Sequence, residues 1–207
     1  HAGLKECPFT TFKKNGVTYG FAAFSPNTGT IKINDYKNAR KIISHLDTVC
    51  DIVIVSFHGG AEGSTKNHIT REKEIFLGED RGNPYEFSRV SIDAGADIVF
   101  GHGPHVTRAI DIYKDRFISY SLGNFATYGR FNLSGPNGIS PIIELDLDSN
   151  GKFIKGQIHS IKQTGRGGPV IDNNNRALKE IIELTKVDIS ECNLNIDKDG
   201  SLSKKNE

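Results

Sequence analysis

The sequence contains no methionine, although a natural reading frame begins with one. Because the chain starts at His1 instead, we expect a processed or truncated product whose upstream signals are not visible. The first residues lack a basic start followed by an apolar stretch, so they do not read as a secretory signal peptide. No apolar run approaches the roughly 18 residues that cross a bilayer, so we expect no membrane span in this chain.

Cysteine is scarce and widely spaced, at Cys7, Cys50 and Cys192. The absence of a Cys-x-x-Cys motif argues against a cysteine zinc site or a redox motif. Cys50 borders an apolar run and is expected to pack as a small hydrophobe. Cys7 and Cys192 lie in loop-like surroundings near the two ends, and whether they pair with each other or with another segment is left open.

An excess of charge of one sign is also missing, since the formal net charge is +1. This balance argues against nucleic acid or a membrane surface as a partner chosen by bulk electrostatics. Hydrophobic residues make up 36% and charged residues 25% of the 207 residues, which is enough apolar material for a packed core. Because the sequence shows no internal repeat and no low-complexity linker, we expect one domain.

An α/β layer is predicted in the middle of the chain. Apolar residues at helical spacing, with capping residues, predict helices over residues 34–47 and 83–95. Each helix precedes a short β-branched run, at residues 51–57 and 97–100. Such runs are typical of parallel strands buried on both faces, and we expect the two to be neighbours in one sheet.

Hairpins are predicted on both sides of this layer. Turn residues at 15–16, 114–115 and 150–151 each separate two β-rich runs. A late helix is expected near residues 174–186. The end of the chain, residues 191–207, is polar and is expected to form a frayed tail.

Histidines follow both central strands. The first strand leads into His58, within FHGGAEG, and the second leads into His102 and His105, within FGHGPHV. The carboxyl ends of adjacent parallel strands meet at one edge of a sheet, where ligands gather, and glycines there clear space for a ligand. We therefore expect the three imidazoles to converge in one cleft. Imidazole suits Zn, Mn and Fe, and Glu62 is the nearest carboxylate or acid–base group.

A structural role is the alternative for each histidine, because a histidine after a strand can shape a turn by bonding a carbonyl group. Two strand ends with the same chemistry favour a site over that alternative. The other histidines lack this context and are expected to be structural or solvated; they are His1, His45, His68 and His159.

A third unusual segment, ISYSLGNFATYGRF at residues 118–131, ends a strand and turns at Asn124. Asn124 and nearby hydroxyls either line a ligand or belong to a tight turn with an aromatic plug. A phosphate-binding loop is not indicated, because GRGGPV at residues 165–170 has no following Lys-Ser/Thr. A serine nucleophile elbow is excluded, because no Gly-x-Ser-x-Gly occurs.

Three motifs in this order resemble the bacterial capsule-synthesis CapA, or poly-γ-glutamate capsule (PGA_cap), family: DIVIVSFHGGAEG, IDAGADIVFGHGPHV and YKDRFISYSLGNF. The resemblance covers residues 15–125. That family is similar in fold to the calcineurin-like metallophosphatases. The resemblance therefore implies an α/β, two-sheet sandwich flanked by helices, of which residues 1–190 would be the C-terminal portion, incomplete at the N-terminus.

The resemblance also implies roles for the residues singled out above. His58, His102 and His105 would bind a divalent metal (Mn, Fe or Zn) in the full-length protein. His105 and Glu62 would be catalytic, and Asn124 and Glu62 would contact substrate.

The chain departs from the family pattern at two glycines and at its start. Gly59 stands where the family has tryptophan, and Gly103 stands where it has a middle histidine. The early aspartate and histidine motifs of the superfamily are absent. The resemblance thus implies that about half of the metal ligands would precede His1, which makes metal occupancy of this chain alone an open question.

Two functions from different classes follow. The first is a metal-dependent hydrolase or transferase acting on a phosphoester, peptidoglycan-linked or polyglutamate substrate. The second is a non-catalytic surface protein that binds, exports or anchors an anionic capsule polymer. Both imply an extracytoplasmic location, at the cell surface or in the periplasm. An incomplete fold would expose a sheet edge, which favours self-association.

Overall fold

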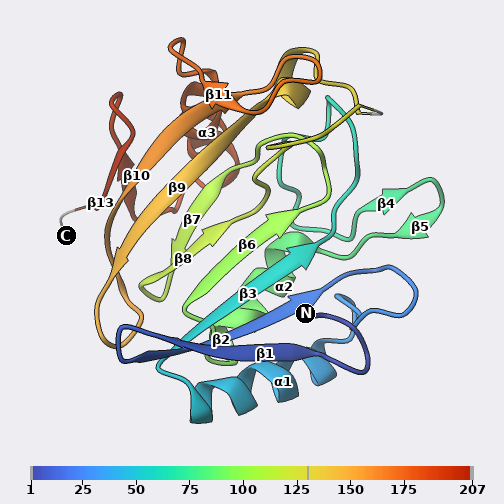
Figure 1. Cartoon of the computed structure of the whole chain (residues 1–207), viewed down its shortest axis with the longest axis vertical. Coiled ribbons are helices and arrows are strands. Elements are labelled where there is room, and N and C mark those ends of the chain that lie inside the picture. The colour runs from blue at the N-terminus through green and yellow to red at the C-terminus, as the bar shows by residue number, and fades with distance from the viewer. Residues whose placement is uncertain (1, 130, 206–207) are drawn as a thin grey trace.

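The computed structural model describes residues 2–129 and 131–205, which form two main β-sheets and three α-helices (Figure 1). The helices are α1 (Tyr36–Val49), α2 (Pro84–Asp93) and α3 (Arg176–Asp188), with a short 3-10 helix η1 (Gly135–Gly138). The larger sheet has the strand order β1-β2-β3-β6-β8-β7. Its strands are β1 (Phe9–Lys14), β2 (Val17–Phe24), β3 (Ile52–His58), β6 (Ile98–His102), β7 (Ile110–Tyr113) and β8 (Arg116–Ser119).

The second sheet is built around β10, which pairs with β9, β11 and β13, and β13 in turn pairs with β12. Its strands are β9 (Ile139–Leu147), β10 (Phe153–Lys162), β11 (Val170–Ile171), β12 (Leu194–Ile196) and β13 (Ser201–Lys204). A small ribbon of β4 (Ile75–Phe76) and β5 (Glu79–Asp80) projects from the long loop after β3 (Figure 1). The α/β, two-sheet architecture predicted from the sequence is confirmed.

The two central strands are parallel neighbours, as the sequence predicts. Ile54 lies opposite Ile98 in the register of β3 and β6. Helices α1 and α2 cover one face of this sheet, where Val53 and Val55 are fully buried. The other face is only half-buried, at Ile54 for example. The expectation that these strands are buried on both faces is therefore wrong, because Ile54 and Ile98 on the second face line a half-open cavity between the two sheets.

The caps and turns form where the sequence places them. The Asp35 side chain accepts a hydrogen bond from the Asn38 amide and so caps α1, while Asn83 caps α2. At the hairpin between β1 and β2, Asn15 and Gly16 both have positive φ angles, of 52° and 85°. A type I′ turn requires this backbone conformation, so local turn chemistry sets the register of the hairpin.

The two sheets meet along β8 and β10, where the rings of Phe117 and Phe153 stack with centroids 6.1 Å apart. Farther along, between β3, β6 and β9, they border a half-open cavity of about 550 Å³. Its apolar lining includes Ile54, Ile98 and Leu145. In the described structure β9 pairs only with β10 and so forms an edge of its sheet, whereas self-association through such an edge stays a prediction.

Within the described residues, the polar end of the chain is ordered as a β-hairpin and not frayed. Residues 194–204 form β12 and β13, and β13 pairs with the central strand β10. Leu194 and Leu202 are buried in the same core as the larger sheet. The prediction of a frayed tail is wrong because two well-spaced leucines supply enough apolar burial to hold a short hairpin against β10.

Three further sequence predictions concern cysteines, histidines and the membrane. Cys50 and Cys192 carry free thiols. His1 lies outside the described residues. Within the described part of the chain, none of the helices is both long and apolar enough to cross a membrane.

Candidate functional site

The site lies where β3 and β6 end side by side. His58 and His102 are the last residues of these strands and are directly opposite each other in the parallel register. They belong to the strands themselves and not to the turns that follow, so the sheet fixes their positions. Burial lowers the pKa of His102, and it also lowers the pKa of His58 to about 4, with Arg81, His105 and His102 adding to the effect. Both imidazoles are therefore neutral at neutral pH.

A buried arginine that the sequence analysis missed lies at the centre of the site. Arg81 Nη2 is 2.9 Å from His58 Nε2 and 2.8 Å from Glu62 Oε1. A guanidinium group only donates hydrogen bonds, so His58 Nε2 accepts one and the proton of the neutral ring is on Nδ1. Arg81 thereby connects the end of β3 to the loop that carries Glu62. Nothing in the local sequence, EDRGN, distinguishes this arginine from a solvated one.

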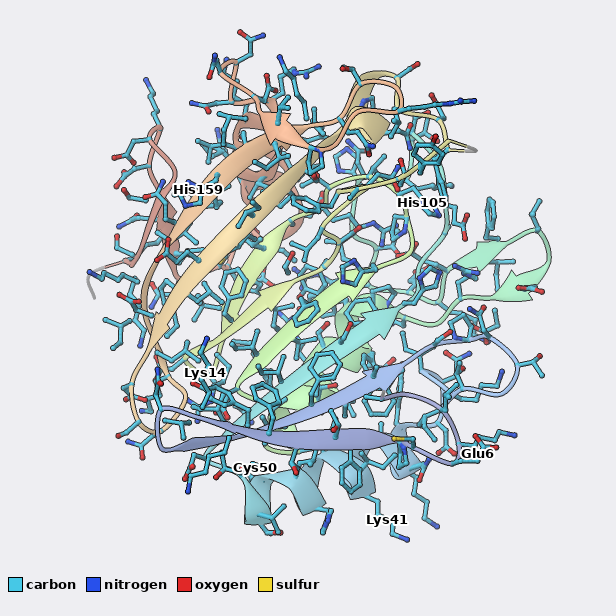
Figure 2. The ribbon with its side chains drawn as sticks, in the orientation of Figure 1. Glu6, Lys14, Lys41, Cys50, His105 and His159 are labelled. Carbon is cyan, nitrogen blue, oxygen red and sulfur yellow. The ribbon has the colours of Figure 1, made fainter. Side chains whose placement is uncertain are left out.

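His105 lies beyond the ends of β3 and β6, at the end of the molecule away from Lys14 (Figure 2). Its Nδ1 is 2.8 Å from Asn124 Oδ1. Asn124 Nδ2 donates to the carbonyl oxygens of His105 and Asn137, at 3.2 and 3.1 Å, which identifies the other amide atom as the acceptor. His105 Nδ1 is therefore the protonated nitrogen, and Nε2 carries the lone pair in the neutral ring.

The free nitrogen of His105 faces a carboxylate. His105 Nε2 is 3.5 Å from Glu62 Oε2, and about a quarter of each side chain remains accessible, 28% and 25% respectively. This approach is an ion pair only when the imidazole is protonated. The sequence predicts that His58, His102, His105, Glu62 and Asn124 share one cleft. In the structure Arg81 joins His58 to Glu62, and His105 lies between Glu62 and Asn124. His102 lies opposite His58 in the strand register, and a cleft shared by all five residues stays a prediction.

His105 is held in a strained backbone conformation, with φ of 61°. Glycine enters this left-handed region at little cost; other residues are uncommon there, although asparagine, aspartate and histidine occur more often than the rest. The His105 carbonyl accepts hydrogen bonds from two buried amides, Asn124 Nδ2 at 3.2 Å and Asn137 Nδ2 at 2.9 Å. These bonds hold the strained geometry, and strain of this kind is typical of functional sites.

A buried ion pair supports the loop that carries Glu62. The guanidinium of Arg108 donates from both Nη1 and Nη2 to Glu74, at 2.8 Å each. Both side chains are buried, at 1% and 6% exposed. Glu74 also accepts from the Ala61 amide at 2.7 Å, and Arg108 Nε donates to the Lys66 carbonyl at 2.8 Å. The pair thus holds the backbone on both sides of Glu62.

The glycines around the site serve chain packing and not ligand space. A Cβ atom at Gly103 would collide with the Gly59 carbonyl oxygen, and one at Gly101 would collide with the Phe57 ring. A Cβ atom at Gly59 would come within 2.7 Å of Ile33 Cδ1. The expectation that these glycines clear room for a ligand is therefore wrong, because the chain itself fills that room.

The residues present do not fit a metal ion in this arrangement. Among the described residues, no three His, Cys, Asp or Glu side chains are grouped closely enough to hold one. His58 Nε2 is bonded to the cation Arg81, and His105 Nδ1 is bonded to Asn124. Metal binding by His58, His102 and His105 stays a prediction.

The ends of two parallel strands and the loops that follow them thus carry a cluster of His58, Arg81, Glu62 and His105, which defines a candidate acid–base site in an α/β fold. The model of the family "Bacterial capsule synthesis protein PGA_cap" matches residues 8–128, and the chain belongs to this family. The match covers every residue of the site except Asn137.

Two curated relatives support the assignment. The "Capsule biosynthesis protein CapA" of Bacillus anthracis is 32% identical over 137 residues, which are 65% of this chain and 29% of that protein. The "PGA biosynthesis protein CapA" of Bacillus subtilis (strain 168) is 34% identical over 124 residues, which are 55% of this chain and 29% of that protein. The chain thus spans less than a third of the length of these relatives.

Solved structures with a similar arrangement include a phosphatase from Mycoplasma pneumoniae, with a TM-score of 0.49 and 16% identity, covering 77% of this chain and 58% of that one. A putative 5′-nucleotidase from Staphylococcus aureus has a TM-score of 0.48 and 12% identity, covering 87% of this chain and 34% of that one. At this level of similarity they carry no information about the chemistry of the site.

Proposed function

We propose that this chain carries the acid–base group of a site that cleaves a bond in a capsule polymer or transfers a polymer segment to another acceptor. The observation that carries the proposal is the alignment of Asn124, His105 and Glu62, with a 2.8 Å contact on one side of the imidazole and a 3.5 Å approach on the other. A histidine oriented by one partner and open on its second nitrogen is suited to general acid–base catalysis. The family supports a role in capsule synthesis, and with it an extracytoplasmic location.

The chemistry assigned to each residue follows from the contacts. Neutral His105 takes a proton at Nε2 from the attacking hydroxyl or water and later returns it to the leaving oxygen. Glu62 stabilises the imidazolium that forms in between. Asn124 keeps the Nδ1 proton in place, so that Nε2 is always the atom that exchanges protons. Arg81 holds Glu62 in position through the hydrogen bond to Glu62 Oε1.

In our proposal the substrate carries acidic groups and is either an anionic capsule polymer or a phosphoester. No step is assigned to a metal, because the described arrangement does not fit one. A role for Mn, Fe or Zn would require ligands beyond those grouped here, and it would require His58 to leave Arg81.

A second candidate is a non-catalytic protein that binds an anionic capsule polymer at the cell surface. The observation that favours it is the bonding of Arg81 to both His58 and Glu62, which satisfies the polar cluster without any added group. Under this alternative the cleft is a preformed polar surface, and His105 contributes hydrogen bonds to the polymer but transfers no proton.

The test is turnover by the natural full-length protein on three probes: poly-γ-glutamate, polygalacturonate and bis(p-nitrophenyl) phosphate. We expect His105→Gln to lower the rate about 100-fold or more, the range general acid–base catalysis supplies. The matched control is His159→Gln, on β10, where the histidine is exposed and 3.6 Å from Glu144. Equal rates for the two variants would refute the catalytic proposal, and polymer binding without turnover by the wild type would favour the second candidate.

A further inference from the structure

Exposed aromatic side chains gather on the segment that follows Asn124. Phe125 is 43%, Tyr128 80% and Phe131 49% exposed. We call these three residues the aromatic rim. A tyrosine ring that is four-fifths exposed gains nothing from packing in the fold, and large apolar groups clustered on a surface mark binding sites.

The aromatic rim adjoins the candidate active site. The ring of Phe131 lies against the imidazole of His105, with centroids 5.0 Å apart and planes tilted by 46°. Asn124, which orients His105, immediately precedes Phe125 in the chain. A chain-like ligand that covers the rim therefore reaches the proton-transferring nitrogen of His105 without leaving the surface.

A buried amide fixes the rim in place. Gln163 is 2% exposed, and its Oε1 accepts from the amide and the hydroxyl of Thr127, at 2.8 and 3.1 Å. Its Nε2 donates to the carbonyls of Thr127 and Gly167. One side chain therefore joins the rim to the loop that carries Arg166.

This junction adds a cation to the rim. The guanidinium carbon of Arg166 is 5.8 Å from the centroid of the Tyr128 ring, and the Arg166 side chain is exposed. At Tyr128 the rim thus offers a flat ring and a positive charge side by side on the surface.

We propose that the aromatic rim binds the sugar rings of an acidic polysaccharide. This proposal rests on the proposed function and specifies its substrate class. A sugar ring has a face of C–H groups, which the electron-rich face of an aromatic ring attracts and shields from water. A uronate carboxylate beside such a ring pairs with a guanidinium. A polyglutamate chain has carboxylates but no broad C–H face, so it would use Arg166 and leave Tyr128 without a role.

The experiment is calorimetric titration of the natural full-length protein with three probes: a polygalacturonate oligomer, a neutral cello-oligosaccharide and a poly-γ-glutamate oligomer of matched length. We expect polygalacturonate to bind most tightly. Tyr128→Ala should weaken its binding about tenfold, the loss typical of one well-placed aromatic contact, and Tyr128→Phe should retain it. Arg166→Ala should weaken polygalacturonate binding but leave the cello-oligosaccharide unaffected.

The control variant is Phe12→Ala, which removes another exposed ring, 47% accessible, on β1. It should bind all three probes like the wild type. Preferential binding of poly-γ-glutamate, or an equal effect of Tyr128→Ala and Phe12→Ala, would overturn the proposal. If polygalacturonate binds through Tyr128 but no polymer is cleaved, the proposed catalysis fails while the rim assignment holds. If a polymer is cleaved in a His105-dependent way and Tyr128→Ala changes nothing, only the rim assignment fails.

Discussion

The strained backbone of His105 leads to a stability test that does not depend on knowing the substrate. At φ of 61°, an alanine in place of His105 would keep the strain, whereas a glycine would remove it. Both variants lose the same imidazole and its contact with Asn124. The difference between their free energies of unfolding therefore reports only the cost of the backbone conformation at position 105. His102 provides the control, because it is the last residue of β6 and its φ is not among the positive values of the described chain.

The expected magnitude follows from two opposing effects. A left-handed conformation costs a residue other than glycine about 1–2 kcal/mol. Glycine, in turn, lowers the free energy of unfolding by about 0.4–1 kcal/mol relative to alanine, because it gives the unfolded chain more conformational freedom. We therefore expect His105→Gly to be more stable than His105→Ala by about 0.5–1 kcal/mol. At position 102 the order should reverse, with His102→Ala the more stable by about 0.5–1 kcal/mol.

Urea unfolding followed by circular dichroism measures these differences, provided that the four variants share one m-value. The quantity to compare is the glycine-minus-alanine difference in unfolding free energy at each position. If His105→Ala proves as stable as His105→Gly, then position 105 is not strained, and the argument that the fold sacrifices stability to place this imidazole is wrong.

Three further predictions concern the supporting pair, the pH dependence and metal uptake. Glu74→Gln should lower the free energy of unfolding by about 3 kcal/mol, because it leaves Arg108 buried without a counter-charge. As the control, Asp146→Asn in the exposed pair with Lys155 should lower it by under about 1 kcal/mol. Urea midpoints that shift equally in the two variants would contradict this. The pKa of His58 is about 4 in the folded protein, below its unfolded value near 6.5. The stability that neutral His58 contributes is therefore complete above about pH 6.5 and is lost as the pH falls toward 4. An NMR titration should show the ring neutral at pH 5.5, and a midpoint near 6.5 would refute the effect of burial. In the natural full-length protein, His102→Ala with His105→Ala should abolish any metal uptake, measured by elemental analysis, without loss of the circular dichroism spectrum, and retained metal would exclude these two ligands.

The local patterns of the sequence predict most of the fold. Turn residues such as Asn15 and Gly16 require particular backbone angles, and the caps Asp35 and Asn83 satisfy helix-end amides, so these elements follow from neighbouring residues alone. The prediction of a frayed tail was wrong because it considered only neighbouring residues. The hairpin of β12 and β13 depends on pairing with β10, where Ser201 lies opposite Gln157 and Ser203 opposite Lys155, and no local signal indicates such distant contacts.

The candidate site could be predicted in part for the same reason. Parallel strands that end at one edge bring His58 and His102 together, which strand order alone implies. Arg81 reaches these residues from a loop 23 positions along the chain, and its role depends on burial that the sequence does not reveal. The prediction that the glycines clear space for a ligand was wrong because their packing is a tertiary effect. A Cβ atom at Gly103 would collide with Gly59, which the local sequence does not indicate.

The protonation of the His105 ring, measured by ¹⁵N NMR of histidine-labelled protein, tests the proposed acid–base role most directly. We predict that the neutral ring carries its proton on Nδ1, that Asn124→Ala abolishes this preference, and that Glu62→Gln leaves it intact. A neutral ring protonated on Nε2 in the wild type would place the lone pair toward Asn124, and it would contradict the assignment of His105 Nε2 as the atom that transfers protons.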